Sequence, residues 1–335
     1  FAVTRAWQGL LTLVLAILTF ILYFAWRKHI PLSAAVLTVV VDVMGQYPAV
    51  VGTAFLSLPV SIVFAGLWGV ELTGFAKMAQ DEVISRGAMI AALIFSAFSA
   101  FWVSQVIGNV VMTTIAGVYA TWYFVSAEAN TGNGRPELQS PTAQSFSRAM
   151  TWSFGSICFG SLIVALIQTV RFCIQLFNDR DSIAGAIAVC LLDIIDSLVQ
   201  YFNYYAYIQV AIYGKPYLKA AGDVWRLMDS RGVNSIINDN IIGTFCSTAM
   251  FVIAMVCGGI AFAFTRDIVY GLPCGFVALF LAMLLASLPL SILSTGSTTL
   301  FVCLAEDPEA LKRTKPELYE RFLRKYARIM SGWSV

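Results

Sequence analysis

The sequence has little charge and almost no histidine, and these deficits exclude several classes of function. Only 12% of its 335 residues are charged, and it contains one histidine, His29. A soluble domain usually carries about 25% charge. The chain also lacks GxSxG, HExxH and GxxxxGK[ST] motifs, which mark hydrolases, zinc proteases and P-loop proteins. We therefore expect no enzymatic activity, no catalytic residue and no cofactor, and the net charge of +2 gives no basis for nucleic-acid binding.

The sequence also lacks closely spaced cysteine pairs. The seven cysteines lie in or beside apolar runs, and none belongs to a CxxC pair. Neither a metal site nor a disulfide framework is therefore expected. The chain begins at Phe1 instead of Met, and we recognise no cleavable signal with a small-residue cut site in it. We expect it to be part of a longer protein.

Apolar residues are abundant, at 59% of the chain. A membrane-spanning helix needs about 20 such residues, and nothing in the chain alternates like a barrel strand. The sequence therefore predicts an all-α, polytopic transmembrane helix bundle over residues 1–304, followed by a charged tail, 305–335. Seven spans are predicted, near residues 7–26, 47–72, 87–124, 145–168, 183–213, 241–264 and 269–304.

Two segments differ from a simple membrane-spanning helix. Residues 31–46, which include Asp42 and Gln46, are predicted to form an interfacial lead-in to the second span. The third span, 87–124, is too long for one straight crossing, so it tilts, extends beyond the membrane or splits near Gly108.

When the first span runs inward, 15 of the 21 Lys and Arg residues lie on the side of the tail. The tail and the loop at about 126–147 are therefore predicted to be cytoplasmic.

Small residues follow one face of the fourth span, which we take as the organising element. Ala149, Ser153, Ser156 and Gly160 are spaced by 4, 3 and 4 residues. This spacing keeps them on one helical face, where a second helix can approach closely. Two interpretations stay open: a static packing seam, or a seam that slides during a transport cycle.

Polar and aromatic residues form stripes on two other spans. Carboxylates near mid-membrane are costly and usually face a bundle interior or a wet cavity. Each stripe is either a sealed network between helices or the lining of a substrate path. The candidate binding residues are Trp102, Gln105 and Asn109 in the third span, and Asp193, Asp196, Tyr204 and Tyr207 in the fifth.

Four motifs resemble one known family. They are FWVSQVIGNVVMTTIAGVYATWYF (101–124), FGSICFGSLIVALIQ (154–168), AYIQVAIYGKPY (206–217) and LAEDPEALKRTKPELYERF (304–322). They resemble choline transporter-like proteins, especially the fungal branch. The resemblance implies ten transmembrane helices, of which these seven are the last, and a cytoplasmic C-terminus. It also implies sodium-independent movement of choline, or of ethanolamine, across the plasma membrane or an organelle membrane.

Choline is a quaternary ammonium ion with no N–H donor on its nitrogen, so aromatic faces and a nearby carboxylate are suited to bind it. We therefore expect the seven candidate residues to converge on one cavity near the bilayer centre. The alternative is a non-transporting membrane protein that binds lipids or partner proteins through its loops and tail. A transporter needs a wet path at mid-depth, whereas a scaffold seals its polar groups against one another.

Overall fold

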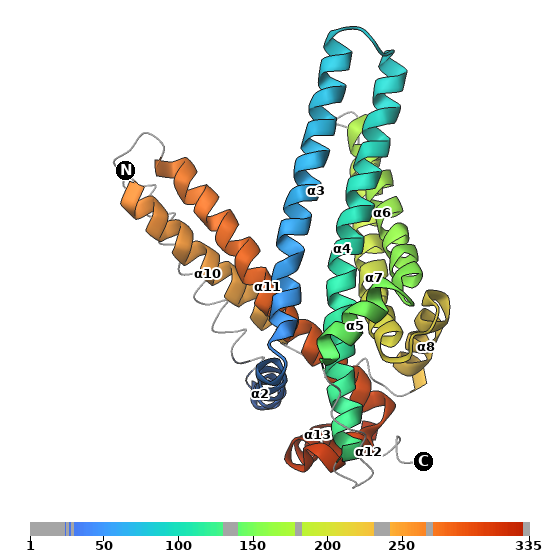
Figure 1. Ribbon diagram of the computed structural model, residues 1–335, viewed down its shortest axis with the longest axis vertical. Coiled ribbons are helices and arrows are strands. Elements are labelled where there is room, and N and C mark those ends of the chain that lie inside the picture. The colour runs from blue at the N-terminus through green and yellow to red at the C-terminus, as the bar shows by residue number, and fades with distance from the viewer. Residues whose placement is uncertain are drawn as a thin grey trace.

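The computed structural model describes Phe24, Arg27 and residues 30–129, 140–177, 183–230, 242–265 and 271–330. These residues form helices joined by short connections (Figure 1). The helices are α2 (Ile30–Gln46), α3 (Ala49–Gln80), α4 (Arg86–Ala129), α5 (Pro141–Met150), α6 (Phe154–Phe177), α7 (Ile183–Tyr213), α8 (Tyr217–Ser230), α10 (Ile242–Thr265), α11 (Gly271–Glu306), α12 (Pro308–Thr314) and α13 (Pro316–Met330).

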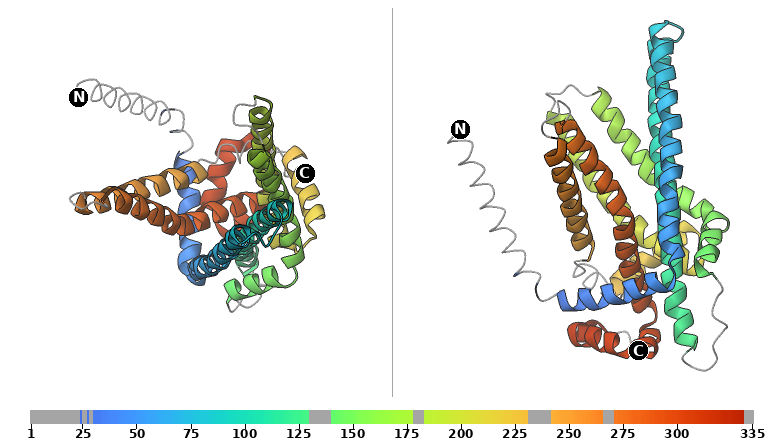
Figure 2. Two further views of the ribbon diagram at one scale, coloured as in Figure 1. Left: turned by 90° about the horizontal axis from the view of Figure 1, so that it is seen from above. Right: turned by 60° about the vertical axis from the view of Figure 1, so that its left-hand side comes forward.

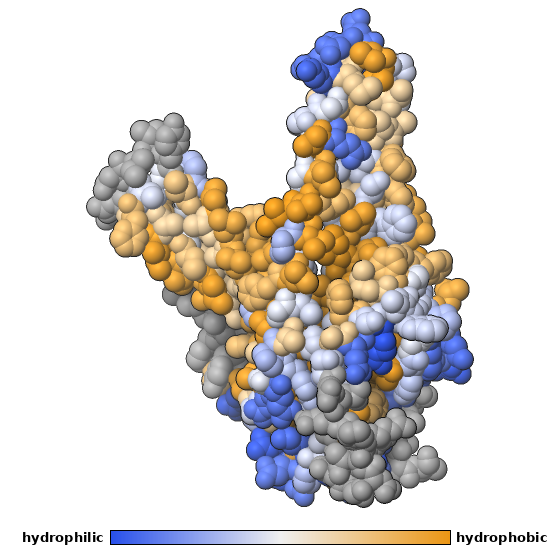
Figure 3. Space-filling view, viewed as in Figure 1, coloured by the Kyte–Doolittle hydropathy of each residue, from blue (hydrophilic) through white to orange (hydrophobic). Residues whose placement is uncertain are grey.

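Six helices are long and apolar enough to cross a membrane: α3, α4, α6, α7, α10 and α11. They fall on the second to seventh predicted spans, which confirms the all-α polytopic fold; the first predicted span, 7–26, lies outside the described residues except for Phe24. The predicted lead-in is the separate helix α2, which lies across one end of the bundle (Figure 2). Apolar residues cover much of the visible middle of α3, α4, α10 and α11, whereas polar residues gather at the tip of the α3–α4 hairpin and at the end near α2 (Figure 3).

The third predicted span is one continuous helix, α4, of 44 residues. It does not split near Gly108. At about 1.5 Å per residue it is roughly twice as long as the apolar core of a bilayer is thick, so it extends beyond the membrane. It packs against α3, α5, α6, α7, α11 and α12, which makes it the central helix of the described bundle.

The fourth predicted span, 145–168, is not one helix, so this prediction was wrong. α5 ends at Met150, a turn covers Thr151–Ser153, and α6 begins at Phe154. The Thr151 hydroxyl donates to Ser147 O at 2.7 Å, and Ser153 N donates to Arg148 O at 3.0 Å. The Ser153 amide thus bonds five residues back, a turn typical of helix C-terminal ends, and hydropathy does not register such a turn.

The small-residue face survives the break but is divided between α5, the turn and α6. Ala149, Ser153 and Gly160 are buried and Ser156 is half-buried. A Cβ on Gly160 would lie 2.5 Å from Tyr207 Oη of α7 and 2.6 Å from Tyr217 Cε2 of α8. The prediction that this face contacts another helix is therefore confirmed at Gly160.

Several segments meet at the end of the bundle marked by α2. Tyr123 Oη, near the C-terminal end of α4, donates to Asp307 O at 2.8 Å. The Asp307 carboxylate caps α12 by accepting hydrogen bonds from the Glu309 and Ala310 amides. The helices of the tail thus lie at the same end as the C-terminal end of α4, and α13 also contacts α2. The predicted loop at about 126–147 is shortened by helix on both sides, since α4 ends at Ala129 and α5 begins at Pro141.

The contact at Gly160 predicts a specific effect of side-chain size. Gly160→Leu should destabilise the protein by about 1–3 kcal/mol, because the added atoms overlap two tyrosines of neighbouring helices. Gly155→Leu is the matched control on the same helix, since a Cβ at Gly155 meets nothing within 4 Å. Thermal unfolding in detergent measures both variants. Equal unfolding midpoints for the two variants would contradict the packing argument.

Candidate functional site

Five polar side chains from four helices form one hydrogen-bonded group, which we call the polar cluster: Asn109 of α4, Ser161 of α6, Asn203 and Tyr207 of α7, and Tyr217 of α8. Asn109 Nδ2 donates to Ser161 Oγ at 2.9 Å and to Tyr207 Oη at 3.3 Å. Tyr207 Oη lies 3.4 Å from Ser161 Oγ and donates to Ile157 O at 3.3 Å. The stripes of the third and fifth spans therefore meet here.

The second half of the polar cluster surrounds Gly160. Asn203 Nδ2 donates to Gly160 O at 3.2 Å, and Tyr217 Oη donates to Asn203 Oδ1. Because Gly160 has no Cβ, the rings of Tyr207 and Tyr217 both reach the α6 backbone. Their ring centroids are 5.9 Å apart. One glycine thus allows the hydroxyl and amide groups to come within hydrogen-bonding distance.

Trp102 joins the edge of the polar cluster. Its Nε1 donates to Cys158 O at 3.0 Å, and Cys158 is three residues from Ser161 on α6. The indole also stacks on Phe98 of the same helix, with ring centroids 5.9 Å apart. An aromatic surface therefore lies about one helical turn from the Asn109 and Tyr207 contacts.

The other predicted site residues have different neighbours. Tyr204 Oη donates to Thr295 Oγ1 of α11 at 3.3 Å, and Asp193 forms a 2.8 Å ion pair with Arg171 of α6. Gln105 is half-buried. The structure thus brings together Trp102, Asn109 and Tyr207 from the predicted set.

Asp196 is the unusual member of the predicted set. It is 8% exposed, and its Oδ1 atom is buried without a hydrogen-bond partner among the described residues. It lies on the same face of α7 as Asn203 and Tyr207, since the positions differ by 7 and 11 residues. Along the helix axis it is about 16 Å from Tyr207 at 1.5 Å per residue. The Asp196 carboxylate therefore lies on the same face of α7 as the polar cluster, but closer to the N-terminal end of the helix.

Ion pairs at Asp223 stabilise α8, whose first residue is Tyr217. Lys215 Nζ contacts Asp223 Oδ2 at 2.7 Å, and Arg226 pairs with the other oxygen of the same carboxylate. Hydrogen bonds from these two cations lower the pKa of Asp223, and burial raises the pKa of the Tyr217 phenol. Asp223 thus stays ionised as the anchor, while the Tyr217 hydroxyl stays neutral and able to donate.

A separate link joins α7 to α11. Gln209 Nε2 donates to Glu306 Oε1 at 2.7 Å, and Tyr213 Oη donates to Glu306 Oε2 at 3.1 Å. Both donors lie beyond the polar cluster, toward the C-terminal end of α7. Helix α7 therefore has two groups of polar partners: α4, α6 and α8 around Tyr207, and α11 around Tyr204 and Glu306.

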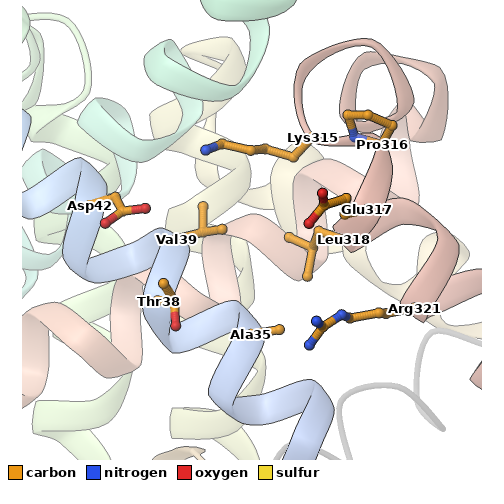
Figure 4. A pocket seen from close by; sticks show the side chains of 9 residues that line it. All are labelled: Ala35, Thr38, Val39, Asp42, Lys315, Pro316, Glu317, Leu318 and Arg321. Carbon is orange, nitrogen blue, oxygen red and sulfur yellow. The ribbon is translucent and has the colours of Figure 1, made fainter.

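Open space lies away from the predicted site. Two cavities of about 290 Å³ each adjoin α5, and a groove of about 460 Å³ separates α2 from α13. Lys315 and Arg321 reach into the groove from the α13 side, and Asp42 and Glu317 also line it (Figure 4). The groove thus carries both signs of charge. The predicted site residues line neither these two cavities nor the groove.

Comparison with known proteins identifies the family. Residues 10–309 match the model of the plasma-membrane choline transporter family. The chain belongs to the choline transporter-like family. It is 35% identical to protein PNS1 of Debaryomyces hansenii, over 93% of this chain and 66% of that protein. It is also 35% identical to a CTL-like protein of Dictyostelium discoideum, over 95% and 56% of the two chains, and 32% identical to protein PNS1 of Cryptococcus neoformans, over 98% and 64%.

Membership in the choline transporter-like family confirms the resemblance found in the sequence, and the six apolar helices agree with a multi-pass membrane protein. The chain spans 56–66% of the length of these three relatives. The activity and substrate of the whole protein are therefore matters for proposal.

Sequence reasoning missed several residues that the structure places at the site. Ser161, the acceptor for Asn109, is absent from the predicted set. Tyr217 was absent from the predicted set because it begins α8, outside any predicted span. The available signal was the GKPY sequence at 214–217: a glycine at φ +65° and a proline end α7 and turn the next tyrosine back onto α6.

The polar cluster predicts a measurable coupling between two side chains. Asn203→Leu should destabilise the protein by about 1–3 kcal/mol, because it leaves the Tyr217 hydroxyl buried without its acceptor. Tyr217→Phe added to this variant should recover part of the loss, since it removes the orphaned group. Thermal unfolding in detergent measures the double-mutant cycle. Gln200→Leu, at an exposed position on the same helix, is the control, and fully additive losses would contradict the coupling.

Proposed function

We propose that this protein is a membrane transporter of choline or a related small organic cation such as ethanolamine, and not an enzyme. Family membership supports transport as the general activity. We further propose that it acts in the plasma membrane with its C-terminal tail in the cytoplasm, as the distribution of Lys and Arg favours.

The observation that carries the proposal is the buried carboxylate of Asp196, whose Oδ1 has no hydrogen-bond partner among the described residues. A carboxylate within a membrane span is costly unless a positive charge approaches it. The substrate is such a charge. Trp102 and Tyr207, farther along the same interior, offer aromatic faces to a quaternary ammonium group, and Asn109 offers an amide to its hydroxyl. Asp196 would attract the cation, and the aromatic groups would receive it.

The polar cluster also indicates what the transport cycle must do. Its amide and hydroxyl groups are bonded to one another, so a substrate enters only when α6 separates from α4 and α7. The hydrogen bonds that break are then replaced by contacts with the substrate and with water. In this scheme Gly160 lies at the seam that opens, because a Cβ there would lie 2.5 Å from Tyr207 Oη of α7.

A non-transporting protein that binds lipids or partner proteins is the second candidate function. The mutual hydrogen bonding of the polar cluster favours it, because a permanently sealed network provides no path. The orphaned carboxylate of Asp196 favours transport, since a scaffold gains nothing from an unpaired buried acid.

Uptake of labelled choline into proteoliposomes tests the proposal. Trp102→Ala should reduce uptake about 2- to 30-fold, whereas Trp102→Phe should keep most of it, because phenylalanine retains an aromatic face. Both variants lose the hydrogen bond to Cys158 O, so the difference between them isolates the aromatic face. An excess of unlabelled ethanolamine shows whether a protonated primary amine competes.

Asp196→Asn tests the carboxylate in the same assay. It should strongly reduce choline uptake while the protein still inserts and folds, because asparagine has nearly the same shape without the charge. Glu320→Gln, in the exposed part of the tail, is the control for loss of an acidic residue. Wild-type protein that moves no choline would contradict the transporter proposal, and full uptake by both Asp196→Asn and Trp102→Ala would contradict the site.

A further inference from the structure

A cavity of about 290 Å³ lies beside the break between α5 and α6, and we call it the α5 cavity. Its wall comes from Thr113 and Gly117 of α4, Ser145 and Arg148 of α5, the turn before α6, and the C-terminal end of α7. A second cavity of the same volume shares Gly117 and Arg148 with it. The proposed transport function uses neither space.

The charge of the α5 cavity has one sign. Arg148 is the one charged side chain among the described residues that line either cavity, and no Asp or Glu is among them. The hydrogen bond that the structure shows for its guanidinium is to Ser145 Oγ, at 3.3 Å. The groove between α2 and α13 differs, since acids accompany its bases. The α5 cavity therefore favours an anion.

A buried donor without a partner lies in the same wall. Thr113 is 3% exposed, and its Oγ1 has no hydrogen-bond partner in the described structure. The neighbouring Thr114 shows the usual alternative, because its Oγ1 donates to Val110 O at 2.8 Å. Buried hydroxyls are nearly always bonded. Thr113 thus presents a hydroxyl to the α5 cavity that a ligand can use.

The N-terminal end of α6 also favours an anion in the α5 cavity. Ser153, which lines the α5 cavity, directly precedes the first residue of this 24-residue helix. The N-terminal end of a helix carries partial positive charge and unpaired amides, which favour phosphate groups. A guanidinium, hydroxyls and a helix N-terminus together match the acceptor-rich surface of phosphate.

The surroundings of the α5 cavity are apolar and exposed. Trp152, in its wall, is 89% exposed, and Met150, two residues earlier in the chain, is 44% exposed. Phe146 and Phe154 are exposed as well. Tryptophan is enriched where a membrane meets water. The cavity therefore joins an anion-binding wall to a surface that suits lipid chains.

We propose that the α5 cavity binds the phosphate group of a membrane phospholipid. Arg148 is the ionic partner, and the hydroxyls of Thr113 and Ser153 donate hydrogen bonds to the phosphate oxygens. Soluble phosphate esters carry the same chemical group, so the test must distinguish the two sources.

Native mass spectrometry of the purified protein, titrated with three probes, makes this distinction. The probes are phosphatidylcholine, a diacylglycerol with the same chains, and phosphocholine. Phosphatidylcholine should bind more tightly than diacylglycerol, which lacks phosphate. Arg148→Gln should weaken phosphatidylcholine binding about tenfold and Thr113→Val by a smaller factor, because each removes a donor to a charged group. Arg148→Lys should retain part of the affinity.

Arg324→Gln is the matched control, because Arg324 is exposed on α13 and outside the lining of both cavities. Thermal unfolding shows whether each variant is folded. If Arg148→Gln does not fold, phosphatidylcholine binding by the nearly isosteric Thr113→Val variant tests the proposal. Phosphocholine binding as tightly as phosphatidylcholine, with the same dependence on Arg148, would support the phosphate site and assign it to soluble esters. Equal binding of diacylglycerol, or phosphatidylcholine binding unchanged in Arg148→Gln and Thr113→Val, would overturn the proposal.

Discussion

A polar side chain inside a membrane must find its partner in the protein, because lipid offers none. In this chain that requirement holds four helices together. Asn109, Ser161, Asn203, Tyr207 and Tyr217 satisfy one another across α4, α6, α7 and α8. The arrangement depends on Gly160, since any larger residue would occupy the positions of the tyrosine rings. The close approach of two tyrosine rings to the α6 backbone at Gly160 and the polar cluster therefore depend on each other.

Helix α7 divides its polar contacts between two neighbours. Tyr207 faces α6, whereas Tyr204 and Gln209 face α11 and its last residue, Glu306. Opening the seam between α6 and α7 therefore does not require the link between α7 and α11 to break. The lone carboxylate of Asp196 lies on the face that such a movement would expose. The proposed transport cycle between closed and open states would use this separation of the two sets of contacts.

Much of the fold could be predicted from apolar run length, and the bounds predicted for α7 agree with the structure. The stripe spacing also directed Asn109 and Tyr207 to a common interior. It could not separate Tyr204 from Tyr207, because three residues leave two side chains about 60° apart, which is enough to select different neighbours. The pairing of Asp193 was missed because Arg171 lies beyond the predicted end of the fourth span, on a helix that continues to Phe177.

The central claim is that a small organic cation reaches the polar cluster from water. Its most direct test is chemical modification of Ser161→Cys, in protein whose seven native cysteines are replaced, by a methanethiosulfonate carrying a trimethylammonium group. This reagent resembles choline and reacts only where water and a quaternary ammonium group can enter. The account predicts that position 161 is modified in proteoliposomes and that choline slows the reaction. No modification, or a rate that choline leaves unchanged, would contradict it.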